Sequence, residues 1–339
     1  MSEGLERTDH FERLPWTDFN YDSLLSIFAP VVEQPWLHPP PRRGIDPMEV
    51  EIFDEKSVES HLTKYTMPLV NAALIQANGL LGHDDNHRGH IWATGRGGTT
   101  SGRPDWSVCS PDRKHQSGRY VNLVPGDTKV SKKWLPTLKR DNLAQWALPI
   151  RQVFSYSRDL KVRYGFIITD ADLVVLRFRR FEIGPGSSQS RPMRAYLARA
   201  RMLSTASDTS AISATSLARP PSSTGAQGSE YSDSQPTGEF APPEYCTIPW
   251  SNYNTALDGK PSKRKSPVLT VRLALFYLCL LAGNSPDTSM GHDYPPLNSW
   301  TKTGAGYVHN STGKKVTQPP ENATVVDPRS NSSTRSDSA

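Results

Sequence analysis

Three short motifs between positions 103 and 156 contain residue types that could cleave a phosphodiester bond. They are a Pro-Asp pair ending at Asp105, an Asp-x-Lys triplet from Asp127 to Lys129, and a Gln-x-x-x-Tyr segment from Gln152 to Tyr156. Such cleavage needs a metal ion that polarises the phosphoryl oxygen and activates water, together with positive charge for the transition state. Aspartate oxygens suit Mg²⁺, with Mn²⁺ as an alternative, and Lys129 can orient the water or offset developing charge. The third motif can hold a phosphate or a nucleotide strand by hydrogen bonds.

A strand is expected to position the second motif. The segment YVNLVPGDTKV, residues 120–130, reads as a strand with a Pro-Gly irregularity, and such irregularities favour a strand edge or a bulge. Because side chains alternate along a strand, Asp127 and Lys129 share a face while Thr128 points the other way. Asp105 lies far enough upstream for one strand to come in, turn and return beside it.

Helices are expected on both sides of this strand in the sequence. Before it, apolar residues recur at helical spacing from Val58 to Ala73, with Asp54 as N-cap and with Pro68 as an interruption. After it, an apolar stripe from Leu143 to Phe154 predicts a helix on which Gln152 and Tyr156 share one face, one turn apart.

Two β-rich runs, YGFIITD and DLVVLRFRR, follow the second helix and predict a hairpin or strand pair. The order helix, strands, helix, strands predicts an α/β fold with a mixed sheet.

Composition predicts one folded unit with long disordered segments. Only 36% of the residues are hydrophobic, and the chain has 29 prolines and 23 glycines. We expect a flexible N-terminal arm over 1–45, a core over 46–183, a disordered insert over 184–242, a C-terminal part of the core over 243–300, and a disordered tail over 301–339. The apolar stretch 268–282 is too short for a membrane span and contains Arg272, so a buried helix is expected there.

Charge and cysteine content indicate an intracellular protein with a polyanionic partner. The net charge is +5, and Arg96, Arg103, Lys132 and Lys133 are the candidates for phosphate contacts. Three scattered cysteines predict neither a disulfide framework nor a zinc site. The charged first residues lack a signal peptide, so a nuclear or cytoplasmic location is expected rather than secretion, with no membrane association. The basic run 260–265 fits an import signal, a nucleic-acid contact or a solvated loop equally well.

The ordered set of motifs resembles the PD-(D/E)XK nuclease superfamily, in its RecB-like branch. The phrases RPDW, PGDTKVSKKW and RYGFIITDADLVVLR are similar to fungal PD-(D/E)XK nuclease-like proteins over roughly 50–182, and less closely over 243–300. The resemblance implies a restriction-endonuclease-like core, a central mixed sheet flanked by helices. Pro125, inside the motif strand, departs from the family pattern.

The resemblance also implies roles for the site residues. Asp105 and Asp127 would bind the metal, Lys129 would be catalytic, and Gln152 with Tyr156 would support the site. A glutamate on the first helix would complete the metal ligands, and Glu59 is chosen over Glu55 because it lies deeper in the helix.

Two functions are compatible with these motifs. The first is an Mg²⁺-dependent nuclease that hydrolyses phosphodiester bonds of DNA, or of RNA, with DNA the preferred expectation. The alternative is a catalytically inactive nuclease-fold module that binds nucleic acid or a protein partner, because a fold does not by itself imply activity.

Overall fold

A mixed β-sheet lies at the centre of the computed structural model, which describes residues 14–37, 47–81, 90–95, 103–180 apart from 115 and 117, 241–252 and 267–327. All of these belong to one unit of the chain. The strand order is β1-β2-β4-β5-β6-β7, with β3 paired to β2. The strands are β1 (Ile91–Thr94), β2 (Trp106–Lys114), β3 (Tyr120–Asn122), β4 (Gly126–Thr128), β5 (Tyr164–Ile168), β6 (Asp172–Arg177) and β7 (Glu244–Pro249). Among the described strands of this sheet, β4 and β5 pair in parallel and the other pairs are antiparallel, so the predicted mixed sheet of an α/β fold is confirmed.

The predicted hairpin is formed by β5 and β6, whose residues are almost all buried. Thr169 closes its turn, since Oγ1 accepts the backbone N–H groups of Ala171 at 3.0 Å and Asp172 at 2.8 Å. The strand predicted over 120–130 is instead split into β3 and β4 around Pro125, which has no N–H to donate to a neighbouring strand. The expected irregularity is therefore a break between two short strands.

Helix α4 (Leu143–Leu160) makes the crossover that the parallel pair β4 and β5 requires. It begins at Asn142, whose side chain accepts the N–H of Gln145 at 3.0 Å. The helix packs closely on the sheet, because a Cβ added at Gly165 of β5 would lie 2.5 Å from Val153. A short 3₁₀ turn, η5 (Pro136–Arg140), precedes it.

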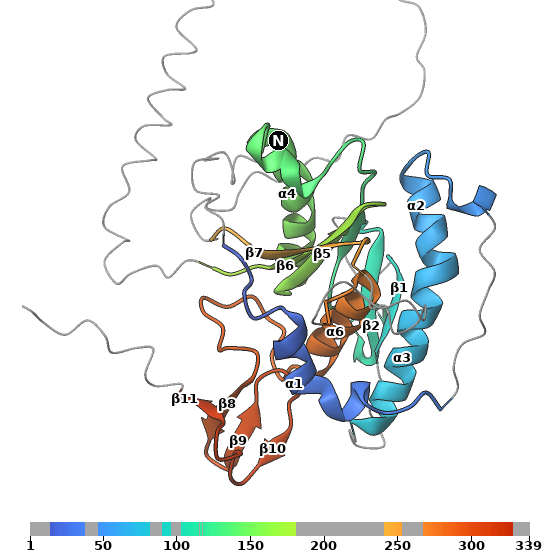
Figure 1. The fold of residues 1–339 in the computed structure, drawn as a ribbon. Coiled ribbons are helices and arrows are strands. Elements are labelled where there is room, and N and C mark those ends of the chain that lie inside the picture. The colour runs from blue at the N-terminus through green and yellow to red at the C-terminus, as the bar shows by residue number, and fades with distance from the viewer. Residues whose placement is uncertain are drawn as a thin grey trace, which may run out of the picture. The chain divides into compact units, whose positions relative to one another are not determined.

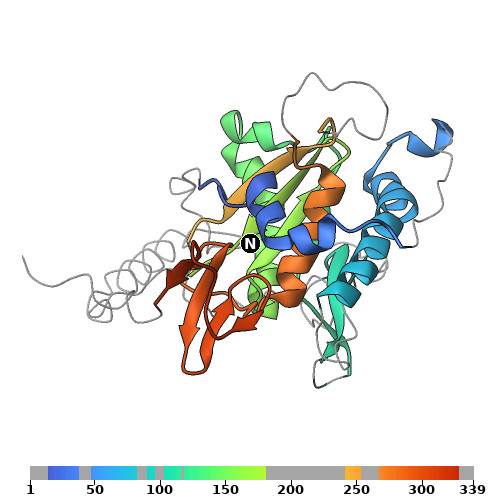
Figure 2. The ribbon, with the colours of Figure 1, turned by 60° about the horizontal axis from the view of Figure 1, so that its bottom comes forward.

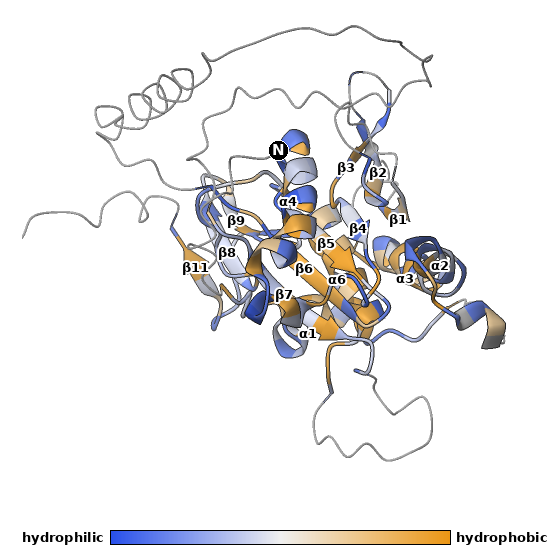
Figure 3. Ribbon diagram, turned by 90° about the horizontal axis from the view of Figure 1, so that it is seen from above, coloured by the Kyte–Doolittle hydropathy of each residue, from blue (hydrophilic) through white to orange (hydrophobic). Residues whose placement is uncertain are grey.

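The opposite face of the sheet is covered by α6 (Val271–Asn284), against which α3 (Met67–Leu80) and α1 (Tyr21–Val32) pack. Figure 3 shows α4 on one side of β5 and β6 and α6 with α1 on the other, and Figures 1 and 2 show the same layers from other directions. Every residue of α6 from Ala274 onward is buried, which confirms the expected buried helix. None of the helices in the described ranges has the length and apolarity of a membrane-spanning segment.

The first predicted helix is formed, in three parts. Asp54 is the N-cap of α2 (Glu55–His61), where its carboxylate accepts the N–H of Ser57 at 2.8 Å. A π-helical turn, η4 (Leu62–Thr66), then leads into α3, and Pro68 occupies the first turn of α3. Proline has no N–H with which to continue the ladder, so the predicted interruption takes the form of a widened turn. A short 3₁₀ turn, η3 (Pro47–Val50), precedes α2.

The prediction of a flexible arm over 1–45 is wrong for residues 14–37. Trp16, Phe19, Leu24 and Phe28 are each at most 2% exposed and belong to the main core. The backbone N–H of Trp16 donates to the carbonyl of Tyr245 in β7 at 2.9 Å. These aromatic residues are buried by elements from the far end of the chain, and a local hydrophobic pattern cannot reveal such contacts.

The prediction of a disordered tail over 301–339 is wrong as far as residue 327. A second sheet with the order β10-β9-β8-β11 contains β8 (Ser299–Thr303), β9 (Gly306–His309), β10 (Lys315–Val316) and β11 (Thr324–Val326). Its polar side chains bond to one another: Oγ1 of Thr301 donates to Asn310 at 2.7 Å, and Nδ2 of Asn310 donates to Ser299 at 2.8 Å. This segment has few apolar residues, which is why disorder was predicted. In the structure, hydrogen bonds between its polar side chains hold the strands together.

Other sequence predictions fall outside the described residues. These are the proline run at 39–41, residues 184–240 of the predicted insert, the basic run 260–265 and the last residues of the tail. In contrast, β7 and α6 belong to the core, as expected for the 243–300 segment.

Candidate active site

Asp105 stands directly before β2 and beside the end of β4. Its Oδ2 accepts the backbone N–H of Thr128 at 2.8 Å. The next residue, Trp106, pairs with Gly126 and donates its indole N–H to Oγ1 of Thr128 at 2.8 Å. Trp106 also belongs to the core on the α6 side, so alternation places Asp105 on the α4 side. The predicted return of one strand beside Asp105 is confirmed.

Asp127 lies on the same side of the sheet as α4. It pairs in parallel register with Ile167, two residues along β5 from Gly165, which packs against Val153 of α4. Paired residues of neighbouring strands point to the same face, so Asp127 also faces this side. Lys129 follows two positions later and forms an ion pair with Asp127. The predicted shared face of Asp127 and Lys129 is therefore present.

The carboxylate of Asp127 is almost completely withdrawn from water. The residue is 1% exposed, and the Lys129 side chain beside it is 18% exposed. Oδ2 of Asp127 contacts Nζ of Lys129 but accepts no hydrogen bond of good geometry within the described residues. Nζ of Lys129 also donates to the carbonyl of Thr128 at 3.1 Å. Within the described residues, the Lys129 ammonium is thus the partner of this buried oxygen.

Burial raises the pKa of Asp127 to about 7, since the Lys129 ammonium only partly compensates and the charges of Asp105 and Glu55 add repulsion. Burial also raises the pKa of Asp105, with a further contribution from Glu59. Acids whose charges raise the pKa of a neighbouring carboxyl group lie close to it and concentrate negative charge, which favours a cation. The two aspartates thus carry more negative charge than the Lys129 ammonium alone neutralises.

Two glutamates that influence these aspartates electrostatically lie on α2, which contacts β4. Glu59 forms an ion pair with Lys56 at 2.7 Å, and Glu55 lies 3.9 Å from Nζ of Lys133. Glu59 acts on Asp105, whereas Glu55 acts on both aspartates. The choice of Glu59 over Glu55 therefore stays a prediction.

Gln152 and Tyr156 share a face of α4, as predicted, and bond to each other. Nε2 of Gln152 donates to the hydroxyl of Tyr156 at 2.8 Å. Helix α4 contacts β4, so this pair is carried by the helix that covers the carboxylate face. The hydrogen bond fixes the relative orientation of the amide and the phenol.

The four predicted phosphate contacts divide into two groups. Arg103, Lys132 and Lys133 are exposed, with Arg103 just before Asp105 and the two lysines just after Lys129 in the chain. Arg96 lies outside the described residues. Three exposed cations thus flank the motif residues in sequence.

Two residues near the site were missed by the sequence reasoning. Asp170 accepts hydrogen bonds from both the backbone N–H and the hydroxyl of Ser131, each at 2.6 Å, and so holds the loop that follows Lys129. Lys56 bonds to Glu59 and feels the charge of Asp105. Asp170 lies in the turn between β5 and β6, and its partner Ser131 is distant in the sequence. The helical spacing of Lys56 and Glu59 could have indicated their pairing.

The site offers two aspartates on one face of the sheet rather than a complete cage of protein ligands among the described residues. Among the described residues, no group of three or more His, Cys, Asp or Glu side chains is assembled for a metal ion. Mg²⁺ commonly keeps several waters and takes one or two protein carboxylates, so Asp105 and Asp127 fit that ion better than one requiring several protein ligands. Comparisons of the chain with family models, with curated proteins and with solved structures gave no match.

Proposed function

We propose that this chain is an Mg²⁺-dependent nuclease, with Mn²⁺ as a possible substitute ion, that hydrolyses phosphodiester bonds of DNA or RNA on a restriction-endonuclease-like core. The observation that carries the proposal is the buried Asp127, ion-paired with Lys129 and facing the same side as Asp105. The order of strands and helices around these residues agrees with the resemblance to the PD-(D/E)XK superfamily. The exposed cations Arg103, Lys132 and Lys133 supply charge for a phosphate backbone.

Asp105 and Asp127 are the residues that would hold the metal, with Glu59 or Glu55 as a further acid. When bound, Mg²⁺ supplies a Lewis acid for the phosphoryl oxygen and lowers the pKa of an attacking water. The aspartate oxygens are hard ligands, and the concentration of negative charge around Asp127 favours a divalent cation.

Lys129 is the residue for proton handling and charge stabilisation. Its ammonium already lies against Asp127, within reach of a group bound between the two aspartates. In that position it orients the attacking water or stabilises negative charge that develops on the phosphoryl oxygens. Gln152 and Tyr156, held together by their hydrogen bond, offer an amide and a hydroxyl for the nucleotide strand.

A cleavage assay tests the proposal directly. Full-length protein is incubated with single-stranded DNA, double-stranded DNA and RNA, in Mg²⁺, in Mn²⁺ and in EDTA. Asp127→Asn keeps the size of the side chain and removes its charge, whereas Asp141→Asn changes an exposed aspartate and serves as the matched control. We expect metal-dependent cleavage by the wild type and by Asp141→Asn, and a loss of at least about 100-fold in Asp127→Asn.

Two outcomes would contradict a nuclease. One is the absence of cleavage of every substrate under all metal conditions, and the other is equal cleavage by Asp127→Asn and the wild type. If cleavage is absent but nucleic acid binds, with an affinity that survives Asp127→Asn and falls steeply with salt, the chain is the inactive binding module instead.

A further inference from the structure

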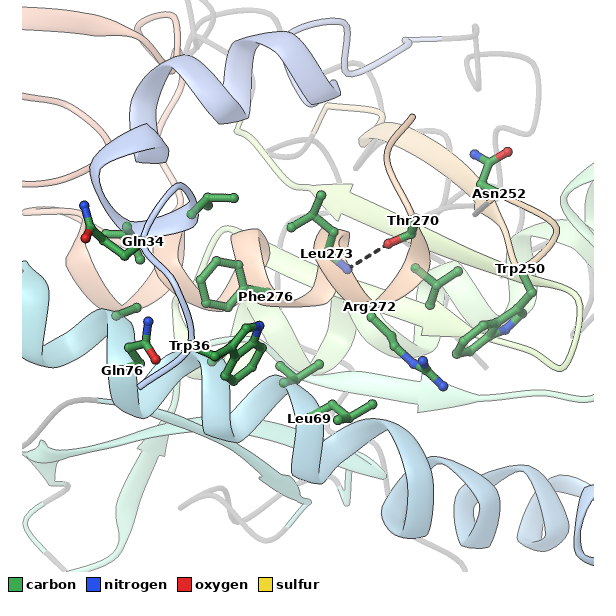
Figure 4. A pocket seen from close by; sticks show the side chains of 16 residues that line it. Gln34, Trp36, Leu69, Gln76, Trp250, Asn252, Thr270, Arg272, Leu273 and Phe276 are labelled. Carbon is green, nitrogen blue, oxygen red and sulfur yellow. Dashed lines mark hydrogen bonds between the residues drawn. The ribbon is translucent and has the colours of Figure 1, made fainter. Parts of the chain in front are cut away.

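A groove runs between α3 and α6, and the chain that follows α1 closes one of its sides (Figure 4). Its volume is about 690 Å³, within the range typical of small-molecule sites. The walls are mainly aliphatic and aromatic, with Leu69 and Ala73 on α3 and with Leu273 and Phe276 on α6. Trp36, which is 47% exposed, lies across the groove in Figure 4. The apolar part of a ligand would therefore be buried against apolar side chains in this groove.

Arg272 is the single charged residue among the described residues that line the groove. It is exposed, and across the described part of the chain no hydrogen bond, ion pair or ring contact engages its guanidinium. The surrounding protein nevertheless lowers the pKa of Arg272 by desolvation. It also stands in the first turn of α6, where the helix dipole disfavours a cation. An anion bound here would relieve both effects.

Two other polar side chains along the groove, those of Gln76 and Trp250, already have partners within the protein. The side-chain amide of Gln76 accepts the N–H of Leu37 at 3.0 Å and donates to the carbonyl of Pro35 at 3.0 Å. The indole N–H of Trp250 donates to the carbonyl of Thr169 at 2.8 Å. These bonds hold the walls in place, and the guanidinium of Arg272 is the charged group along the described lining that is free to receive a ligand.

We propose that this groove binds an amphiphilic carboxylate, a small molecule with one anionic head group and an unbranched alkyl chain. The head group bonds to Arg272, and the chain lies along α3 and α6 toward Trp36. From Leu69 to Ala77 the wall of α3 extends about 12 Å, at 1.5 Å per residue, which accommodates a medium-length alkyl chain. Planar bidentate pairing is the geometry in which arginine prefers carboxylates. This site is separate from the proposed nuclease site and does not depend on it.

Isothermal titration calorimetry of the full chain with three matched probes tests the assignment. The probes are dodecanoate, the neutral dodecanol and the cationic dodecylammonium, each kept below its aggregation concentration. Arg272→Met removes the charge and keeps an unbranched apolar side chain, and Arg119→Met is the control at an exposed arginine that does not line the groove. Circular dichroism verifies that both variants are folded.

We expect dodecanoate to bind the wild type at least about tenfold more tightly than dodecanol, the lower limit for a charge-assisted hydrogen bond, and dodecylammonium to bind more weakly still. Arg272→Met should lose this preference, whereas Arg119→Met should keep it. The proposal is overturned if dodecanoate does not bind, if the acid and the alcohol bind the wild type equally, or if Arg272→Met binds the acid as tightly as the wild type. The probe comparison on the wild type decides the question even if a variant does not fold.

Discussion

Replacing Asp127 by Asn should make the metal-free protein more stable at neutral pH, although it should abolish cleavage. Asp127 is 1% exposed, and burial raises its pKa from 3.8 to about 7. A carboxyl group whose pKa is raised in the folded state destabilises that state once it ionises. This cost is absent below about pH 3.8, grows as the pH rises through the window from 3.8 to 7, and is complete above it.

The magnitude follows from the size of that pKa change. A rise from 3.8 to about 7 corresponds to about 4 kcal/mol, at about 1.4 kcal/mol for each tenfold change in proton affinity. The pKa of about 7 already includes the lowering effect of the Lys129 charge, so the ion pair offsets only part of the cost of burial. Asn resembles the neutral acid and avoids the cost entirely. We therefore expect Asp127→Asn to exceed the wild type by about 4 kcal/mol in EDTA at pH 7 to 8, and to equal it near pH 4.

Urea unfolding between pH 4 and pH 8, followed by tryptophan fluorescence, measures this difference. The other titrating groups are shared by the two proteins and cancel, and Asp141→Asn should follow the wild type throughout. Added Mg²⁺ should stabilise the wild type by mass action and have less effect on Asp127→Asn. If Asp127→Asn is instead less stable at pH 7 by about 3–5 kcal/mol, the ion pair with Lys129 outweighs burial and the reasoning is wrong.

Three further predictions concern other parts of the molecule. Trp16→Ala should cost about 3–5 kcal/mol in urea unfolding, because Trp16 is 2% exposed in the core, whereas a loosely attached arm would lose less than about 0.5 kcal/mol. Burial and the neighbouring Lys314 lower the pKa of His309 to about 4, and its Nδ1 accepts the N–H of Thr312 at 3.2 Å. Stability should therefore be lost as the pH falls from about 6.5 to 4, and thermal unfolding of His309→Gln should lack this component. Asp170→Ala should slow cleavage by about tenfold or more, since Ser131 loses both of its 2.6 Å bonds and the loop after Lys129 is released; an unchanged cleavage rate would exclude this positioning role.

The position of Asp127 illustrates a conflict between stability and function. In the metal-free protein its ionised carboxylate is poorly solvated, and Asp105 and Glu55 add to the repulsion. A divalent cation bound there would reverse the sign of the local potential and stabilise the same carboxylates. The unfavourable electrostatics of the free site and the proposed affinity for Mg²⁺ thus have one physical origin.

Local patterns in the sequence were sufficient to predict the strand and the helix that carry the residues of the proposed site. Alternation along a strand placed Asp127 and Lys129 on one face, and helical spacing placed Gln152 one turn from Tyr156. The Asp54 cap, the break at Pro68 and the buried helix α6 also follow from short-range rules. These features depend on residues that are close in the sequence, and the backbone of a strand or helix fixes the relative positions of such residues.

Only the tertiary structure decided how segments that are distant in the sequence pack against and bond to one another. The N-terminal aromatic residues are buried because β7 and α6 provide their partners, and the polar tail folds because its side chains bond across strands. Likewise, contacts between residues far apart in the chain let Asp170 hold Ser131, and they form a groove in which no described residue is a counterion for Arg272. The strength of these interactions depends on burial and on distances in space, and a one-dimensional pattern contains neither.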